Sequence, residues 1–286
     1  MKKRNALLAM VLASTLALAA CGDDDDEGGG SSSGKADPQS GKAIFEITGS
    51  GKNIKVSGPS EARAGVLEFQ LKNSTKKEAS LQLIGIEGGQ DAAEVIKTGE
   101  AWGDKGGKLP SDLKLAGGTG NVAPGETGVV RQSLSAGRYM ALNIDSNAYA
   151  EFEVTGDGTG TLASTSGTIT ASEYAFETAG PLKAGDVQLT FDNSGKEAHH
   201  IVGLPINPGK TVKEVADFLK EEDEASGPPP FSENGGFDTA ILDGGAEQTF
   251  DAKLKAGKYA LICFIPDRAG GPPHVAKGMV SEAVVE

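Results

Sequence analysis

The side chains best suited to chemistry lie in the C-terminal third of this 286-residue chain. All three histidines are found there, namely His199, His200 and His274, together with Cys263. The only other cysteine, Cys21, follows an N-terminal leader. A single remaining thiol in an exported chain cannot form an internal disulfide, so it is either an inert core residue or a group with a function. The residue types would also allow a cysteine–histidine hydrolase, but no nucleophile motif or orienting partner accompanies Cys263.

The sequence around Cys263 favours a function. The segment Tyr259-Ala260-Leu261-Ile262-Cys263 ends a predicted strand, and Pro273-His274-Val275-Ala276-Lys277-Gly278-Met279 follows a loop rich in glycine and proline. This pattern resembles the plastocyanin and azurin family, the cupredoxins, in which Tyr-x-x-x-Cys leads to Pro-His-x-x-x-Gly-Met. The segment Phe191-Asp192-Asn193, followed by His199, resembles the part of that family that supplies the first histidine ligand. The resemblance implies one type 1 copper, bound by His199, Cys263, His274 and Met279.

The implied ligands suit copper chemically. A thiolate and two imidazoles form a near-trigonal plane around copper, and a thioether is a weak axial partner. Cys263 must lose its proton to bind, and the metal provides the driving force. Taken singly, Cys263 or Met279 could be an ordinary core residue. One feature departs from the family pattern: ten residues separate Cys263 from His274, and the segment 264–272 should bulge out and surround an exposed edge of His274.

An internal repeat indicates the elements that would hold these residues. Val66 to Ser74 reappears 120 residues later as Asp186 to Ser194, and two further segments match at the same offset. Alternating apolar residues and frequent turn signals are typical of β-strands. The prediction is an all-β fold of two tandem cupredoxin-like Greek-key β-sandwich domains, 41–155 and 156–286. Each should contain one short helix, because Thr211 with Glu214, and Asp91 with Glu94, have capping-box spacing.

The repeat also bears on the choice of the first histidine. Leu81 and Leu83 should face inward, which makes Ala79 inward as well, and Ala79 is the counterpart of His199. This parity favours His199 as the ligand, but His200 stays an alternative that could otherwise face solvent or donate a hydrogen bond near the site. In the first repeat Asn143 replaces Cys263 and the loop shortens to 145–149. We therefore expect no type 1 copper in that domain.

The N-terminus has the features of an export signal. Lys2, Lys3 and Arg4 precede an apolar stretch that is too short to span a membrane, and residues 1–20 are interpreted as a signal peptide. Leu18-Ala19-Ala20-Cys21 resembles the bacterial lipobox, which implies cleavage before Cys21 and lipidation of that residue. Residues 21–40 are acidic and then rich in glycine and serine, as expected for a disordered tether. The predicted location is extracytoplasmic, with the lipid as the only membrane attachment.

Charge and histidine content restrict the function. A net charge of -13 disfavours nucleic-acid binding and suits a redox partner protein with a basic docking face. The leading interpretation is a membrane-tethered electron carrier with one copper. The alternatives are a lipoprotein that holds or delivers copper and a metal-free binding module. An enzyme is not expected, because copper oxidases and nitrite reductases need more histidines than this chain contains.

Overall fold

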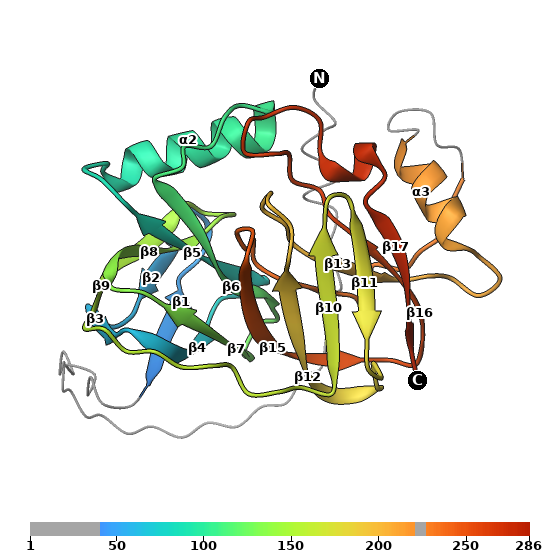
Figure 1. Ribbon diagram of the computed structural model, residues 1–286, viewed down its shortest axis with the longest axis horizontal. Helices are drawn as coiled ribbons and strands as arrows, with labels where there is room; N and C mark the ends of the chain where they lie inside the picture. The colour runs from blue at the N-terminus through green and yellow to red at the C-terminus, as the bar shows by residue number, and fades with distance from the viewer. Residues whose placement is uncertain (1–40, 221–226) are drawn as a thin grey trace.

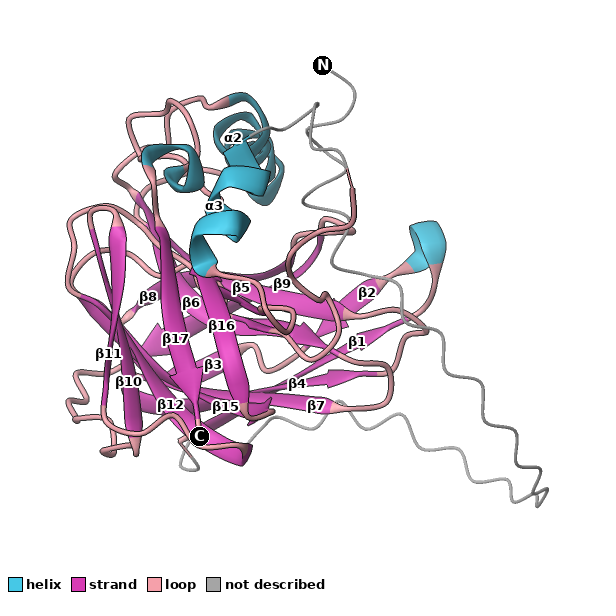
Figure 2. Ribbon diagram, turned by 90° about the vertical axis from the view of Figure 1, so that its right-hand side faces the viewer, coloured by secondary structure: helices cyan, strands magenta, loops and turns pink. Residues whose placement is uncertain are grey.

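The chain folds into three β-sheets with two α-helices at one end, as the computed structural model of residues 41–220 and 227–286 shows (Figures 1 and 2). The predicted signal peptide, lipidated Cys21 and tether lie outside these described residues. Neither helix of the described residues is long and apolar enough to cross a membrane.

The described part of the first half, residues 41–155, contains nine strands, one α-helix and a short 3-10 helix. In chain order they are β1 (Lys42–Thr48), η1 (Gly51–Asn53), β2 (Lys55–Ser57), β3 (Glu61–Arg63), β4 (Gly65–Asn73), β5 (Ala79–Ile86), α2 (Ala92–Lys105), β6 (Leu113–Val122), β7 (Thr127–Leu134), β8 (Gly137–Asn143) and β9 (Ala148–Thr155).

The second half begins after residues 156–166, which form no strand or helix. Its elements are β10 (Gly167–Ser172), β11 (Ala175–Ala179), β12 (Gly185–Asn193), β13 (Val202–Pro205), α3 (Val212–Lys220), β14 (Phe237–Asp238), β15 (Ala246–Leu254), β16 (Gly257–Ile262), the 3-10 helix η2 (His274–Lys277) and β17 (Val280–Val285).

One sheet runs through both halves. Its strand order is β11-β10-β12-β15-β7-β4-β1-β2, and the halves join where β15 pairs antiparallel with β7, placing Phe250 opposite Val130. A five-stranded sheet, β3-β9-β8-β5-β6, belongs to the first half, and a four-stranded sheet, β14-β13-β16-β17, belongs to the second. The smaller sheets pack on the large one through aromatic contacts such as Phe45 with Phe152 at 5.5 Å and Phe250 with Phe237 at 5.9 Å between ring centroids. The predicted all-β sandwich fold is confirmed.

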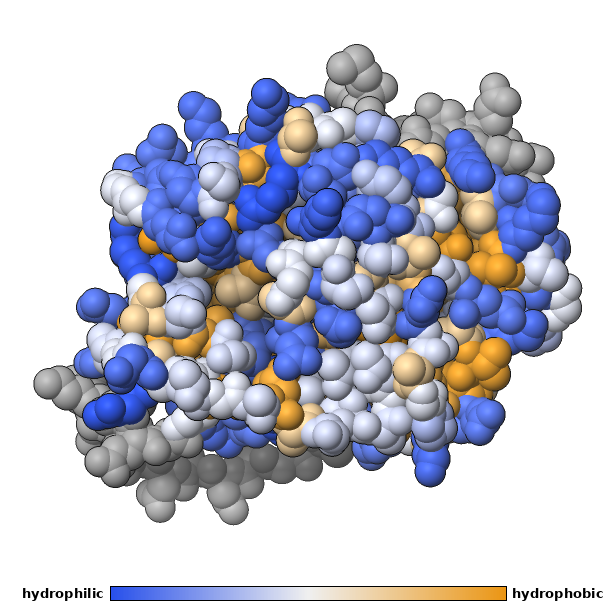
Figure 3. Space-filling view, in the orientation of Figure 1, coloured by the Kyte–Doolittle hydropathy of each residue, from blue (hydrophilic) through white to orange (hydrophobic). Residues whose placement is uncertain are grey.

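The alternation that predicted the strands places one face of each strand in the core. Leu67, Phe69 and Leu71 of β4 are all buried, with partly exposed residues between them. Burying large apolar side chains in this way is the main source of stability in such a sandwich, at about 1.5–3 kcal/mol for each. On the face drawn in Figure 3, polar residues surround the apolar side chains that remain exposed.

Both predicted helix starts are confirmed by their hydrogen bonds. The side chain of Asp91 accepts a hydrogen bond from the backbone N–H of Glu94 and caps α2. At α3 the Glu214 N–H donates to Thr211 Oγ1, and the Thr211 N–H donates to Glu214 Oε2. These bonds satisfy N–H groups that have no partner inside the helix.

The same side-chain contacts occur in both halves at the offset of the sequence repeat. Asn73 Nδ2 donates to the carbonyls of Lys77 and Val122, and Asn193 Nδ2 donates to those of Glu197 and Leu242. Likewise Tyr139 donates to the Ser135 carbonyl, and Tyr259 to the Lys255 carbonyl. The matched segments therefore have the same local structure in each half.

Candidate metal centre

Three side chains that are far apart in the sequence meet in the second half. The Cys263 Sγ lies 3.4 Å from His274 Nδ1 and 3.7 Å from His199 Nδ1, and the two Nδ1 atoms are 3.0 Å apart. All three residues are fully buried. Within the described part of the chain, this is the one group of three or more His, Cys, Asp or Glu residues that is close enough to hold a metal ion.

The dimensions of this triangle suit a transition metal. A point equidistant from the three donor atoms lies about 2.0 Å from each, as the three side lengths require. Bonds from a divalent transition metal to imidazole nitrogen and thiolate sulfur are about 2.0–2.3 Å long. A thiolate with two imidazoles is also the donor set of a trigonal copper site. The three residues therefore fit copper in both type and spacing.

Each donor is held by backbone hydrogen bonds. His199 lies just before β13 and is fixed by two hydrogen bonds to Leu242. The His199 N–H donates to the Leu242 carbonyl at 3.0 Å, and the Leu242 N–H donates to the His199 carbonyl at 2.9 Å. Cys263 follows directly after β16. His274 is the first residue of η2, and its N–H donates to the Ile265 carbonyl at 2.9 Å. Strand ends and a short helix thus position the three donors.

Met279, the fourth predicted ligand, lies beside this triangle. Its side chain is fully buried, and its backbone N–H donates to the His274 carbonyl at 3.0 Å. The Met279 carbonyl in turn accepts from the Cys263 N–H at 3.4 Å. Met279 is therefore tied to two of the three donors through the backbone.

His200 has a different place. Its Nε2 accepts a hydrogen bond from the Phe264 N–H at 2.9 Å, directly after Cys263. His200 therefore acts as an acceptor, not as the donor considered from the sequence. In the first half, the counterparts Ala79 and Asn143 form no such centre: Asn143 bonds instead to the Ser80 carbonyl and to Ser146.

His274 has no exposed edge, and the expectation of one was wrong. Its Nε2 donates to Asp267 Oδ1 at 2.9 Å, and the ring of Tyr174 packs on it at 5.0 Å between centroids. Tyr174 also donates to Asp267 Oδ1, and Lys277 donates to Asp267 Oδ2. The long loop folds back over the imidazole instead of leaving its edge in solvent.

Burial keeps the donors uncharged before a metal binds. It lowers the pKa of His199 to about 4, with help from nearby His274, and it also lowers the pKa of His274, although Asp267 opposes this effect. Burial also raises the pKa of the Cys263 thiol to about 12. At neutral pH both imidazoles therefore carry a free lone pair, and the thiol must release its proton to a base or to solvent when a cation replaces it.

Asp267 keeps its charge despite its position. Burial opposes its ionisation, but hydrogen bonds from Lys277, Tyr174 and His274 outweigh that effect and hold its pKa below the usual value. An ionised Asp267 fixes the proton of His274 on Nε2, so that the Nδ1 lone pair faces Cys263. Sequence reasoning missed Asp267 and Tyr174, since neither belongs to a motif.

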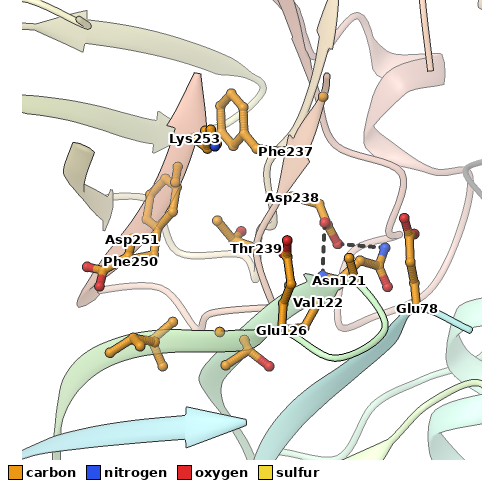
Figure 4. Close-up of a pocket in the computed structure, with 18 of the residues that line it drawn as sticks. Glu78, Asn121, Val122, Glu126, Phe237, Asp238, Thr239, Phe250, Asp251 and Lys253 are labelled. Atoms are coloured by element: carbon orange, nitrogen blue, oxygen red, sulfur yellow. Dashed lines mark hydrogen bonds between the residues drawn. The ribbon is translucent and has the colours of Figure 1, made fainter. Parts of the chain in front are cut away.

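A separate cavity of about 350 Å³ lies between the two halves and includes none of the predicted ligands. Figure 4 shows Glu78, Glu126 and Asp238 around it, with both carboxylate oxygens of Asp238 bonded to Asn121. Burial and the neighbouring carboxylates raise the pKa of Asp238 to about 7. Residues from both halves line this cavity, so it belongs to the contact between them and is separate from the three donors.

Comparisons with known proteins return structural neighbours only. No protein-family model matches the chain, and no curated protein sequence matches it. Auracyanin B is 23% identical and covers 42% of this chain and 86% of its own, with a TM-score of 0.27. Dithionite-reduced auracyanin from the photosynthetic bacterium Roseiflexus castenholzii is 22% identical and covers 42% and 94%, with a TM-score of 0.26. Copper nitrite reductase from Nitrosomonas europaea is 12% identical and covers 85% and 93%, with a TM-score of 0.22. Because these identities and TM-scores are low, the case for a metal site depends on the geometry of His199, Cys263 and His274 alone.

Proposed function

We propose that this chain is a blue copper protein that transfers electrons through one type 1 copper held by His199, Cys263 and His274, with Met279 as the axial ligand. The observation that carries the proposal is the triangle of two Nδ1 atoms and one Sγ, with sides of 3.0, 3.4 and 3.7 Å. When bound, copper supplies a one-electron couple at this point.

The protein's contribution is to fix the positions of these side chains and to exclude water from them. The N–H and the carbonyl of His199 both form hydrogen bonds with Leu242. The N–H of Cys263 donates to Met279, and its carbonyl accepts from Val275. Donors fixed in this way keep one geometry whatever the charge of the bound ion, and a small rearrangement favours fast electron transfer. Full burial of His199, Cys263 and His274 excludes water from the donors.

Burial also supports electron transfer over copper delivery. A delivery site must pass its metal to a partner, which requires exchangeable and accessible ligands. Here all three donors have no exposed surface, and Met140 and Met279 are the only methionines beyond the leader. The centre therefore suits a resident ion better than a cargo ion.

We further propose that the protein works outside the cytoplasm, tethered to a bacterial membrane by a lipid on Cys21. The supporting observations are the charged and apolar leader and the Leu18-Ala19-Ala20-Cys21 sequence. The net charge of -13 favours encounter with a redox partner that presents a basic face. Loss of membrane association in a Cys21→Ser variant would support the tether.

The test of the copper assignment is Cys263→Ser. The purified wild-type chain with Cu(II) should show an intense visible band, because the thiolate transfers charge to copper. The serine variant should keep the far-UV circular dichroism of the wild type and lose the band. Full colour in the serine variant would refute the role of Cys263.

A further inference from the structure

The long loop between Cys263 and His274 is held by the first half of the chain. In Figure 1 the segment joining β16 to β17 extends over the end of the sheets towards α2. The Trp102 Nε1–H at the end of α2 donates to the Asp267 carbonyl at 2.8 Å. The Leu109 N–H donates to the Arg268 carbonyl at 2.8 Å, and the Gly271 N–H donates to the Gly106 carbonyl at 3.1 Å. Three backbone groups of the loop are thus fixed by residues from the other half.

Arg268 strengthens this attachment with its side chain. Its guanidinium donates to the Pro110 carbonyl at 2.9 Å and to the Leu113 carbonyl at 2.7 Å, both in the first half. It also forms a bidentate pair with Asp243, in which Nε donates to Oδ1 at 3.2 Å and Nη2 donates to Oδ2 at 2.9 Å. Asp243 in turn accepts from the Leu115 N–H at 2.9 Å. Planar bidentate pairs of this kind are among the most directional contacts in proteins.

The two backbones approach so closely that a side chain would not fit between them. A Cβ atom on Gly270 would lie 2.3 Å from the Gly106 carbonyl oxygen and 2.5 Å from that of Gly107. Gly270 also has φ +88°, a conformation that other residues rarely adopt. The loop is therefore shaped to fit this surface of the first half.

Asp267 connects this attachment to the metal centre. Its carbonyl is bonded to Trp102 of the first half, and its carboxylate is bonded to His274 Nε2 at 2.9 Å. Tyr174 and Lys277 hold the same carboxylate. One residue thus joins α2 to a donor of the triangle through two successive hydrogen bonds.

We infer that the first half is a positioning element of the metal centre, and that Asp267, held by Trp102, is the positioning residue that aims His274 Nδ1 at the metal. This inference rests on the proposed copper function. A carboxylate that accepts a hydrogen bond from one imidazole N–H fixes the tautomer and orients the ring, which leaves the other nitrogen for the metal. The first half, whose described residues include no group of metal-binding side chains, would thus contribute to the site through this contact.

The test uses Asp267→Ala and Trp102→Phe in the full chain, with Tyr139→Phe as a matched control. Tyr139→Phe also removes one hydrogen bond of a buried aromatic residue in the first half, but Tyr139 bonds to the Ser135 carbonyl, away from the loop. Copper affinity is measured by competition with a chelator, together with the visible spectrum. We expect Asp267→Ala to lower the affinity about 10- to 100-fold and to change the spectrum. Trp102→Phe should lower it about 5-fold, as expected for one hydrogen bond, and Tyr139→Phe should leave it unchanged.

A second measurement does not depend on copper. In the metal-free chain, nitrogen NMR shifts should show His274 protonated at Nε2 in the wild type and a mixture of tautomers in Asp267→Ala. Wild-type affinity and spectrum in Asp267→Ala, or an unchanged tautomer, would overturn the inference while the copper function stood. A wild-type chain that binds no copper would instead overturn the proposed function. If Asp267→Ala fails to fold, the copper affinity of Trp102→Phe is compared with that of Tyr139→Phe, and equal affinities would overturn the inference.

Discussion

Asp238 joins the two halves of the chain, and its replacement by asparagine should change how stability depends on pH. Its Oδ1 accepts from the Asn121 N–H at 3.0 Å, and its Oδ2 accepts from Asn121 Nδ2 at 3.1 Å. Burial raises the pKa of Asp238 to about 7 against the effect of these hydrogen bonds, and Glu78 and Asp145 add to the rise. The folded chain therefore keeps a proton that the unfolded chain releases at a pH near 4.

The sign and size of the effect follow from this difference. Between about pH 4 and pH 7 the folded state binds more protons at Asp238 than the unfolded state, so this residue lowers the free energy of unfolding as pH rises. The slope is at most about 1.4 kcal/mol per pH unit, which gives at most about 4 kcal/mol over the window. Below about pH 4 the contribution is fully present, and above about pH 7 it is lost.

Guanidinium unfolding of wild type and Asp238→Asn at about pH 4.5, 6 and 8 tests this reasoning. An asparagine does not titrate, so the free energy of unfolding of the variant should increase relative to that of the wild type as pH rises. An altered hydrogen bond should in addition lower the variant's free energy of unfolding by about 1 kcal/mol at every pH. Glu78→Gln is a matched control, because removing that neighbouring charge should move the window to lower pH. A difference between wild type and Asp238→Asn that is the same at every pH would refute the raised pKa.

Three further substitutions test the packing of the core and the surroundings of the three donors. Leu83→Ala in β5 should reduce the free energy of unfolding by about 2–5 kcal/mol, because Leu83 is fully buried, whereas Val284→Ala at an exposed position should change it by less than about 0.5 kcal/mol. Denaturant midpoints measure both, and equal effects would contradict the assigned core. His200→Ala should cost about 1–3 kcal/mol by leaving the Phe264 N–H without its acceptor, yet keep the visible copper band, since His200 is not one of the three donors. Loss of the band in this variant would mean that His200 is a ligand.

Local patterns predicted much of the fold because they depend on nearby residues. The alternation of Leu67, Phe69 and Leu71 determines which face of β4 is buried, and the spacing of Thr211 and Glu214 determines where α3 begins. The pairing of β7 with β15 could not be read in this way. Two strand edges far apart in the sequence meet there through backbone groups that all residues share, and an ion pair between Arg131 and Asp251 at 2.8 Å adds to the contact.

The three side chains that meet in the second half were among the residues predicted from the sequence, but their surroundings were not. The order of the predicted ligands was enough to select His199, Cys263 and His274, which the fold brings together. The burial of His274 depends on Asp267 and Tyr174, which come from a loop of unusual length and from the turn between β10 and β11. Polar groups that act only through tertiary contact leave no periodic signal in the sequence.

The most direct test of the copper site is a stoichiometric titration of the purified metal-free chain with Cu(II), followed by gel filtration, metal analysis and reduction with ascorbate. The geometry of the three donors predicts one copper retained per chain, an intense visible band that appears in proportion to it, and reversible loss of that band on reduction and reoxidation. A chain that stays colourless and retains no copper after gel filtration would contradict the assignment of His199, Cys263 and His274 as a copper site.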